Sequence, residues 1–237
     1  MKKREFVIQD LLSKIYQEQF KDGKLPNQRT MAETYQVSRY TIQEAIKTLE
    51  EIGIVQTIQG SGMYVKKQFQ MNPLIFNTLT RTPYERITSR VISLQKKKST
   101  PEEEQIFQLT DSEEIWTFER VRIVDYKIEQ IERSKMPASM FPDLTEEIIE
   151  QSIQEYVLSK KFAISHYITS YSPVTLSKNQ SELLMCKRNT PAMKIENRCL
   201  LNDGKVYEYS ELTAIDYTCT YITPFDKKGH QARRTNI

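Results

Sequence analysis

Cysteine and histidine are scarce in this chain of 237 residues. Its three cysteines are Cys186, Cys199 and Cys219, and its two histidines are His166 and His230. An odd number of widely spaced cysteines does not form a disulfide framework, and no Cys-x-x-Cys or Cys/His pattern supplies the ligands of a structural zinc site. We therefore expect no metal and no other cofactor, and these cysteines fit a reducing compartment.

Long apolar runs are also absent. No stretch approaches the roughly 20 apolar residues that a transmembrane helix needs. The first residues, MKKREFVIQDLL, do not contain the apolar segment of a secretory signal peptide. The sequence therefore predicts a cytoplasmic protein that does not bind a membrane.

Recognisable catalytic motifs are missing too. The sequence has no Gly-x-Ser-x-Gly element, no phosphate-binding P-loop and no cluster of metal ligands. Tyrosine and glutamate are plentiful, but their spacing does not indicate a nucleophile paired with a base. Because these motifs are missing, the sequence does not predict an enzyme.

A large excess of charge is lacking as well, since the formal net charge is only +3. Residues 1–67 contain eleven Lys and Arg against eight Asp and Glu, so they hold the whole excess. Any affinity for nucleic acid must therefore come from a local basic patch in this part of the chain.

The clearest pattern that is present runs from residue 25 to residue 65. It predicts a short helix, a tight turn and then a longer helix, with Ser38 as the N-cap of the longer helix and Gly53 just after its end. Its apolar residues follow helical spacing on one side: Ile42, Ala45, Ile46 and Leu49. The polar side is also what an ordinary amphipathic helix would turn toward water. Ahead of this region, an apolar stripe from Ile8 to Phe20 predicts a helix that Asp22-Gly23 stops.

The residues that follow favour a more specific interpretation. Residues 54–58 and 63–65 are rich in β-formers, and they flank Gln59-Gly60-Ser61-Gly62, a short hairpin signal. A helix-turn-helix followed by such a β-wing is a shape that places one helix in the major groove of DNA. We therefore expect the polar side of the longer helix, with Tyr40, Gln43 and Lys47, to face DNA.

The pattern LPxxRxxAxxYxVSRxTxxxAxxxLxxxGxVxxxxGxGxxV resembles the winged-helix domain of the GntR family of bacterial transcription regulators. The resemblance implies that Arg29 grips DNA and that Gly60 enters the minor groove. It also implies that three residues at the start of the longer helix read bases and phosphates: Ser38, Arg39 and Thr41. Two positions depart from the family pattern. Gln43 replaces the usual arginine, and an amide pairs better with adenine than with guanine, while Gln36 replaces the usual glycine of the turn.

The rest of the chain predicts an α+β domain with an antiparallel sheet. Residues 114–124 and 127–136 predict one hairpin, and residues 193–201 and 206–215 predict a second around an Asp-Gly turn. Short helices are expected after Thr100, from Ser152 and from Ser177 to Lys187, where a Thr or Ser can cap each N-terminus. This order is not that of a parallel-sheet enzyme.

This region resembles the UTRA domain, which accompanies GntR-type winged helices and has a chorismate-lyase-like fold. Four segments carry the resemblance: TPEEE from Thr100, FERVR from Phe118, IERS from Ile131 and VYEYS from Val206. The fold class predicted is therefore α+β, with an N-terminal winged helix-turn-helix joined to an antiparallel-sheet effector domain. The expected organisation is a DNA-binding domain over residues 1–67, a linker over 68–82, and an effector-binding and dimerisation domain over 83–237.

A small-molecule site is predicted at Arg120 and Arg122. On a strand these side chains project to one face, about 7 Å apart along the chain, and two planar cations beside aromatic residues can hold a phosphate or carboxylate. They could equally pair with Glu129, Glu132 or Glu208 across the sheet. The UTRA resemblance implies that both arginines bind the phosphate of an effector. Further contacts are implied at Thr82, Glu132, Ser152 and Glu208, while Ala214 stands where some members have a tyrosine.

The sequence thus predicts a transcription regulator, expected to be a repressor, whose DNA binding a small anionic metabolite such as a phosphorylated sugar controls. Its partners would be double-stranded operator DNA with inverted half-sites, the effector, and a second copy of the chain, because such half-sites require a two-fold protein. Two alternatives remain open. One is a chorismate-lyase-like enzyme, and the other is an architectural DNA binder without a ligand.

Overall fold

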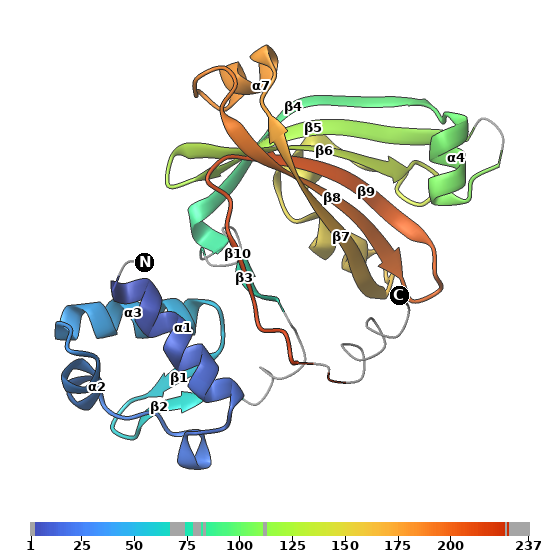
Figure 1. Ribbon diagram of the computed structural model, residues 1–237. Helices are drawn as coiled ribbons and strands as arrows, with labels where there is room; N and C mark the ends of the chain where they lie inside the picture. The colour runs from blue at the N-terminus through green and yellow to red at the C-terminus, as the bar shows by residue number, and fades with distance from the viewer. Residues whose placement is uncertain are drawn as a thin grey trace. The chain divides into compact units, whose positions relative to one another are not determined.

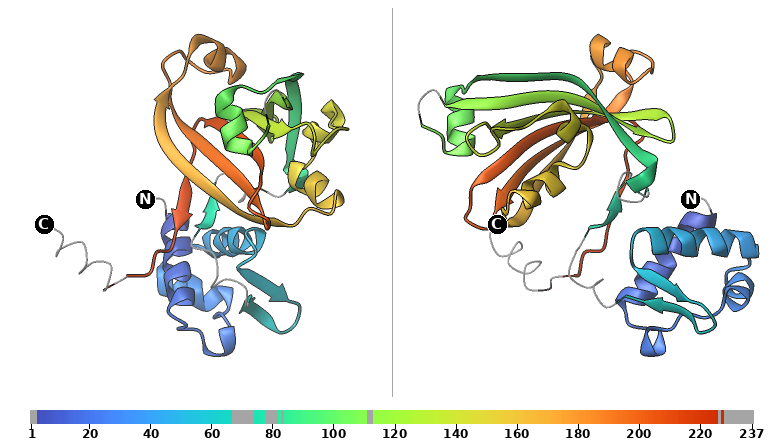
Figure 2. Two further views of the ribbon diagram at one scale, coloured as in Figure 1. Left: turned by 90° about the vertical axis from the view of Figure 1, so that its right-hand side faces the viewer. Right: turned by 180° about the vertical axis from the view of Figure 1, so that it is seen from behind.

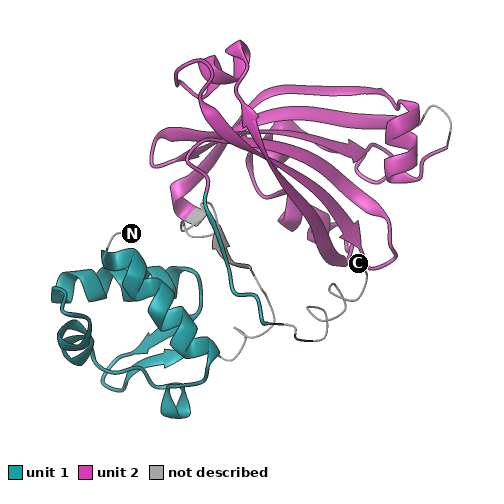
Figure 3. Ribbon diagram, viewed as in Figure 1, with its two compact units in different colours: residues 1–83, 218–237 teal, residues 84–217 magenta. Residues whose placement is uncertain are grey.

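The computed structural model describes residues 3–66, 74–77, 82, 84–110, 113–225 and 227 (Figure 1). The chain forms two compact units (Figure 3). The first, here the N-terminal unit, comprises residues 1–83 together with 218–237, and the second, here the sheet unit, comprises residues 84–217. Of the predicted linker 68–82, only residues 74–77 and 82 are described, and residues 228–237 also lie outside the described part.

The N-terminal unit contains the predicted helix-turn-helix and wing. Its elements are α1 (Lys3–Tyr16), a short 3-10 helix (Lys21–Gly23), α2 (Gln28–Tyr35), α3 (Arg39–Glu51), and the wing strands β1 (Val55–Ile58) and β2 (Gly62–Val65). The predicted cap is confirmed, because the Ser38 hydroxyl accepts a hydrogen bond from the Thr41 N–H at 3.1 Å. Gly53 follows the helix with φ +77°, the left-handed conformation that glycine adopts most easily.

Two local features differ from the simplest expectation. Helix α1 ends at Tyr16, earlier than the apolar stripe suggested, and the half-buried Phe20 reaches the core from the following turn. Gln36 occupies the left-handed region with φ 51°, where the family pattern has glycine. Its N–H bonds to carbonyls of the preceding helix, so the turn keeps its geometry at the cost of modest backbone strain.

The core of this unit is built by the apolar faces of all three helices and the wing. The predicted stripe of α3 is buried throughout, with Ile42, Ala45 and Leu49 fully inaccessible to solvent. From α1, Val7 and Leu11 are equally buried and pack in the same cluster. The helical spacing read from the sequence therefore marks the side of α3 that faces inward, which leaves its polar side outside.

A return segment closes the N-terminal unit, and the sequence did not indicate it. Strand β10 (Cys219–Tyr221) pairs antiparallel with β3 (Leu74–Asn77), so residues after the sheet unit lie beside residues before it (Figure 3). The next residue, Ile222, is half-buried and packs against the core of the helix-turn-helix. The C-terminal part of the chain thereby becomes part of the N-terminal unit.

The sheet unit is a six-stranded antiparallel sheet in the order β4-β5-β6-β9-β8-β7 (Figures 1 and 2). Its strands are β4 (Ile87–Lys98), β5 (Glu114–Val124), β6 (Lys127–Pro137), β7 (Ile164–Thr175), β8 (Pro191–Leu201) and β9 (Val206–Ala214), after a 3-10 turn at Tyr84–Arg86. Both predicted hairpins are present, β5 with β6 and β8 with β9. The α+β class with an antiparallel sheet is therefore confirmed.

Short helices cover both faces of this sheet. We define the charged face as the face that carries Phe118, Arg120 and Glu132; α5 (Glu146–Glu150) and α6 (Ile153–Ser159) pack over one end of it. The opposite face packs against α7 (Lys178–Leu183), which is shorter than predicted, and α4 (Pro101–Phe107). No helix in the described part of the chain is both long and apolar enough to cross a membrane.

The return segment leads to a first prediction. Replacing Ile222 with serine should destabilise the N-terminal unit by about 1–2 kcal/mol, because a half-buried apolar side chain leaves the core. For a chain of this size that corresponds to a melting point lower by roughly 2–8 °C. Thermal unfolding, with hydrogen exchange of the α1 amides as a local readout, measures both effects. The neighbouring exposed Thr223→Ala should change neither, and faster exchange in both variants would contradict a specific role for Ile222.

Candidate functional site

The first candidate surface is the outer side of α3. Ser38, Arg39, Gln43 and Lys47 are exposed, as expected for residues opposite a buried stripe. Tyr40 is 70% exposed in the first turn, an unusual position for a large aromatic side chain. Thr41 is half-buried, and its hydroxyl lies 2.9 Å from that of Ser38, so it takes part in the helix cap.

Two basic residues on this unit form only weak internal ion pairs. Arg29 Nε lies 3.1 Å from Glu33 Oε1, and the two side chains are 73% and 66% exposed. Lys47 Nζ lies 3.9 Å from Glu51 Oε1. Exposed pairs at this spacing contribute well under 1 kcal/mol. Both cations can therefore exchange their carboxylate for a phosphate at little cost.

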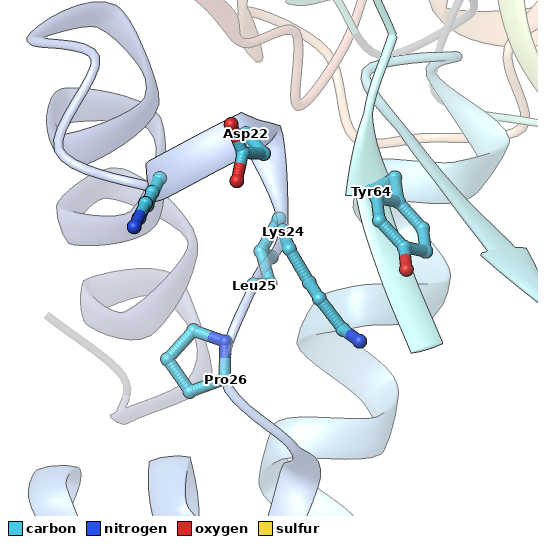
Figure 4. Close-up of a pocket in the computed structure, with 6 residues that line it drawn as sticks. Asp22, Lys24, Leu25, Pro26 and Tyr64 are labelled. Atoms are coloured by element: carbon cyan, nitrogen blue, oxygen red, sulfur yellow. The ribbon is translucent and has the colours of Figure 1, made fainter. Parts of the chain in front are cut away.

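The wing presents backbone rather than side chains at its tip. Gly60 has φ +76°, and a Cβ built there would meet nothing within 4 Å, so this residue is open to a neighbouring surface. At the base, Gly62 has φ +126°, which strains other residues, and a Cβ there would lie 3.1 Å from Lys24 Cε, so the lysine side chain would have to move slightly. Lys24 Nζ lies 5.5 Å from the centroid of the Tyr64 ring. Both residues line an open cavity of about 520 Å³ together with Lys21, Asp22, Leu25 and Pro26 (Figure 4).

The second candidate surface is the charged face of the sheet unit, where a buried arginine stands at the centre. Arg120 is 2% exposed and forms a two-point ion pair with Glu132, with Nε–Oε2 at 2.8 Å and Nη2–Oε1 at 2.9 Å. Its remaining nitrogen, Nη1, donates to the carbonyls of Ile149 and Gln151. The guanidinium of Arg120 is therefore committed to the protein, through the pairing across the sheet that the sequence left open.

Arg122 is bound less tightly than Arg120. Its side chain is 15% exposed and contacts Glu132 through Nε alone, at 3.3 Å from Oε2. Among the described residues, its two terminal nitrogens have no hydrogen-bond partner. Arg122 is thus the member of the pair with donors to offer a ligand.

Glu208 completes the cluster from β9. Both it and Glu132 are buried, and the Ser134 hydroxyl lies between them, donating to Glu208 Oε1 at 2.8 Å and lying 3.3 Å from Glu132 Oε1. The predicted residues Arg120, Arg122, Glu132 and Glu208 are therefore brought together on one face.

The pKa values of the two carboxyl groups are shifted in opposite directions. Burial alone would raise the pKa of Glu132, but the guanidinium groups of Arg120 and Arg122 outweigh it and hold that pKa at about 2. Burial and repulsion by ionised Glu132 raise the pKa of Glu208 to about 7. Near neutral pH the cluster therefore has two cations, one full anion and one partly protonated carboxyl group.

The other predicted effector residues have different positions. Ser152 caps α6, since its hydroxyl accepts from the Glu155 N–H at 3.3 Å, and it follows the Gln151 carbonyl that Arg120 contacts. Thr82 is half-buried and belongs to the N-terminal unit. Ala214 pairs with Gln130 at the end of β9, so the position that some UTRA members fill with tyrosine bears only a methyl group.

Comparison with known proteins accounts for both surfaces. Residues 3–65 match the model of the bacterial regulatory proteins of the gntR family, and residues 84–215 match the model of the UTRA domain. The chain belongs to the GntR family of transcription regulators. Its winged helix is the DNA-binding domain, and its UTRA domain is the effector-binding domain. Because this is a family of regulators, the enzyme alternative is excluded.

Named relatives extend over almost the whole chain. The mannosyl-D-glycerate transport/metabolism system repressor MngR of Escherichia coli is 30% identical over 208 residues, which are 84% of this chain and 85% of MngR. The "Probable fructoselysine utilization operon transcriptional repressor" of the same organism is 25% identical over 216 residues, 88% of this chain and 87% of that protein. The crystal structure of YydK from Bacillus subtilis aligns with a TM-score of 0.57 and 25% identity, covering 95% of this chain and all of the other.

The UTRA domain also contains polar residues on this face that sequence reasoning missed. Ser134 links the two acids, and Gln130 is 2% exposed beside Arg122 on the neighbouring strand. Both share the alternation of Glu132 on β6, two residues to either side, so strand parity placed them on the same face. No sequence signal, however, distinguished a buried Gln from a solvent-facing one.

The raised pKa of Glu208 generates a second prediction. The pKa of Glu208 in the folded protein lies above its value in the unfolded chain. Its contribution to the free energy of unfolding should therefore be fully present below about pH 4.5 and should be lost as the pH rises through about 7. The titration of Glu132 changes stability only between about pH 2 and 4.5, so it does not affect the range between pH 4.5 and 7. Between pH 5 and 8 wild type should lose on the order of 2–3 kcal/mol from this group. Glu208→Gln should flatten the curve of melting temperature against pH, whereas the exposed Glu146→Gln should not. Parallel curves for all three proteins would show that Glu208 titrates normally.

Proposed function

We propose that this GntR regulator is a cytoplasmic repressor whose operator binding is controlled by a small anionic sugar derivative held on the charged face of the UTRA domain. It acts as a homodimer on inverted half-sites, because each winged helix reads one half-site and the pair must share a two-fold axis. The observation that carries the proposal is the geometry of the buried cluster. Glu132 is held by Arg120 through two hydrogen bonds but by Arg122 through Nε alone, which leaves the terminal nitrogens of Arg122 without a partner among the described residues.

Within that cluster the two arginines have different tasks. Arg120 is saturated by Glu132 and by backbone carbonyls, so it positions Glu132 and tethers the segment between α5 and α6. Arg122 has terminal donors without a partner in the described part of the chain, and these bind the anionic group of the effector. Glu132 and Glu208 accept from hydroxyl groups of the effector, and Ser152 supplies a further contact in the manner of the family.

The class of effector is supported by the relatives. One is named for a mannosyl-D-glycerate system and another for fructoselysine utilisation, and both names refer to sugar derivatives. A phosphate and a carboxylate on such a molecule can each accept two parallel hydrogen bonds from the planar guanidinium. We therefore include both anionic groups in the effector class.

DNA reading is assigned to the exposed side of α3 and to the wing. Arg39, Tyr40, Gln43 and Lys47 are the exposed side chains of α3 that enter or flank the major groove, with Ser38 and Thr41 at its cap. Arg29 binds a phosphate, and Gly60 approaches the minor groove. Gln43 would give the half-site an adenine preference where relatives with arginine prefer guanine.

A third prediction tests the reading helix. Arg39→Ala should weaken binding to the selected operator by about 1–3 kcal/mol and flatten base preference, because it removes a bidentate base contact. Lys47→Ala should weaken binding to all duplexes alike and reduce the salt dependence by about one phosphate contact. Selection from a random DNA pool, followed by salt titrations, measures both. Unchanged sequence preferences for Arg39→Ala would show that α3 does not read bases.

A fourth prediction tests the effector site. A thermal-shift panel of glucose 6-phosphate, mannose 6-phosphate, glucosamine 6-phosphate and mannosyl-D-glycerate should contain a compound that stabilises wild type and alters its affinity for DNA. Arg122→Ala should bind that compound at least tenfold more weakly, since one charge-assisted interaction is worth about 1.5–3 kcal/mol. DNA affinity without the compound should stay the same. If no small anion changes operator affinity, the protein is an architectural DNA binder and this proposal fails.

A further inference from the structure

Gln130 is a buried polar side chain whose amide nitrogen has no hydrogen-bond partner in the described part of the chain. It lies on β6, directly opposite Arg122 on β5 and Ala214 on β9, and is 2% exposed. Its Nε2 is buried and has no hydrogen-bond partner among the described residues. A buried N–H donor in this state lowers the stability of the fold, so such groups are rare unless they serve another purpose.

The surroundings explain why no protein acceptor reaches this donor. Across the sheet from Gln130, the charged face changes from polar to apolar, with the methyl group of Ala214 next to it and Met193 beyond. Leu212 and Ile195 continue the same apolar cluster. A methionine would fill this position with the same volume and without an unpaired donor. The amide is therefore not explained by packing.

The register places Gln130 directly beside Arg122, so a molecule bound by Arg122 meets the Nε2 donor once the amide turns toward it. Directly opposed residues on antiparallel strands have Cβ atoms about 5 Å apart, and Arg122 has terminal nitrogens without a partner among the described residues. One small molecule can therefore contact a cationic donor and a neutral donor side by side. Glu132, the next residue on the same face, is already held by Arg120 and Arg122.

We propose that Gln130 is a specificity-determining effector ligand whose Nε2 donates a hydrogen bond to an uncharged acceptor oxygen, a sugar hydroxyl or ring oxygen, next to the anionic group held by Arg122. The inference rests on the proposed function of the charged face. It separates two tasks: Arg122 recognises charge, and Gln130 recognises the oxygen adjacent to it. An effector that lacks this oxygen leaves the amide unpaired and is rejected.

A ligand-free experiment tests the first half of the inference. Gln130→Met removes the unpaired donor at nearly constant volume, so the protein without effector should melt at a temperature roughly 2–6 °C higher than wild type. Thr117→Val is the matched control, because Thr117 Oγ1 is also buried without a hydrogen-bond partner among the described residues, but on the opposite face of β5. Gln130→Met melting below wild type would mean that the amide is a structural group, which would overturn the proposal.

The second half is tested with the compound of the four-member panel that stabilises wild type most. Isothermal titration should show a loss of affinity of at least tenfold for Gln130→Met. For Gln130→Glu the loss should be larger, because its carboxylate not only fails to donate but also repels the anionic group and competes with it for Arg122. Thr117→Val should bind as wild type does. Equal affinities of wild type and Gln130→Met would overturn the inference.

The two proposals fail in different ways. If no panel compound stabilises wild type, the anionic sugar effector is wrong, and the melting temperature of Gln130→Met still decides whether the amide is kept at the expense of stability. If a compound binds, and its affinity depends on Arg122 but not on Gln130, the proposed effector site is supported and only the proposed role of Gln130 is wrong.

Discussion

The buried ion pair between Arg120 and Glu132 is the interaction on which the effector domain depends. It joins two adjacent strands, and the same guanidinium reaches the backbone between α5 and α6, so one side chain fixes the sheet and its cover together. Removing either partner would leave an unpaired buried charge, which typically costs about 3–5 kcal/mol. Replacing both by apolar residues is often neutral, so stability alone does not account for the pair.

What the pair does provide is control over its neighbours. With Glu132 held ionised, Arg122 is oriented through Nε, and its outer nitrogens contact no other described residue. Burial, together with repulsion by Glu132, raises the pKa of Glu208 and favours its neutral form. A single fixed carboxylate thus adds to the effect of burial on the charge state of its neighbours in a largely buried cluster. In such surroundings electrostatic interactions with a ligand are stronger than at an open surface.

Local signals in the sequence were enough to find most of the fold. The N-cap at Ser38, the capping box that begins at Thr100 and the turn at Asp125-Tyr126 each depend on residues within a few positions of one another. Strand parity also placed Arg120 and Arg122 on one face. It could not tell which of them is saturated, because that depends on carbonyls of Ile149 and Gln151, far along the chain. The β3–β10 ladder was missed because its strands are only four and three residues long and show no periodicity. The short α5 was missed for the same reason.

The pairing of β3 with β10 constrains how the genes of such two-domain regulators can recombine. Because Ile222 packs on the helix-turn-helix core, the DNA-binding unit is assembled from segments on both sides of the sheet unit in the chain. A single crossover between the two domains would join a foreign winged helix to a C-terminal segment shaped for another core. Exchanging operator specificity intact therefore requires two coordinated replacements, or a hydrophobic side chain at residue 222 that many cores accept. Winged helices and their C-terminal segments should then evolve as pairs, although most of the sequence lies between them.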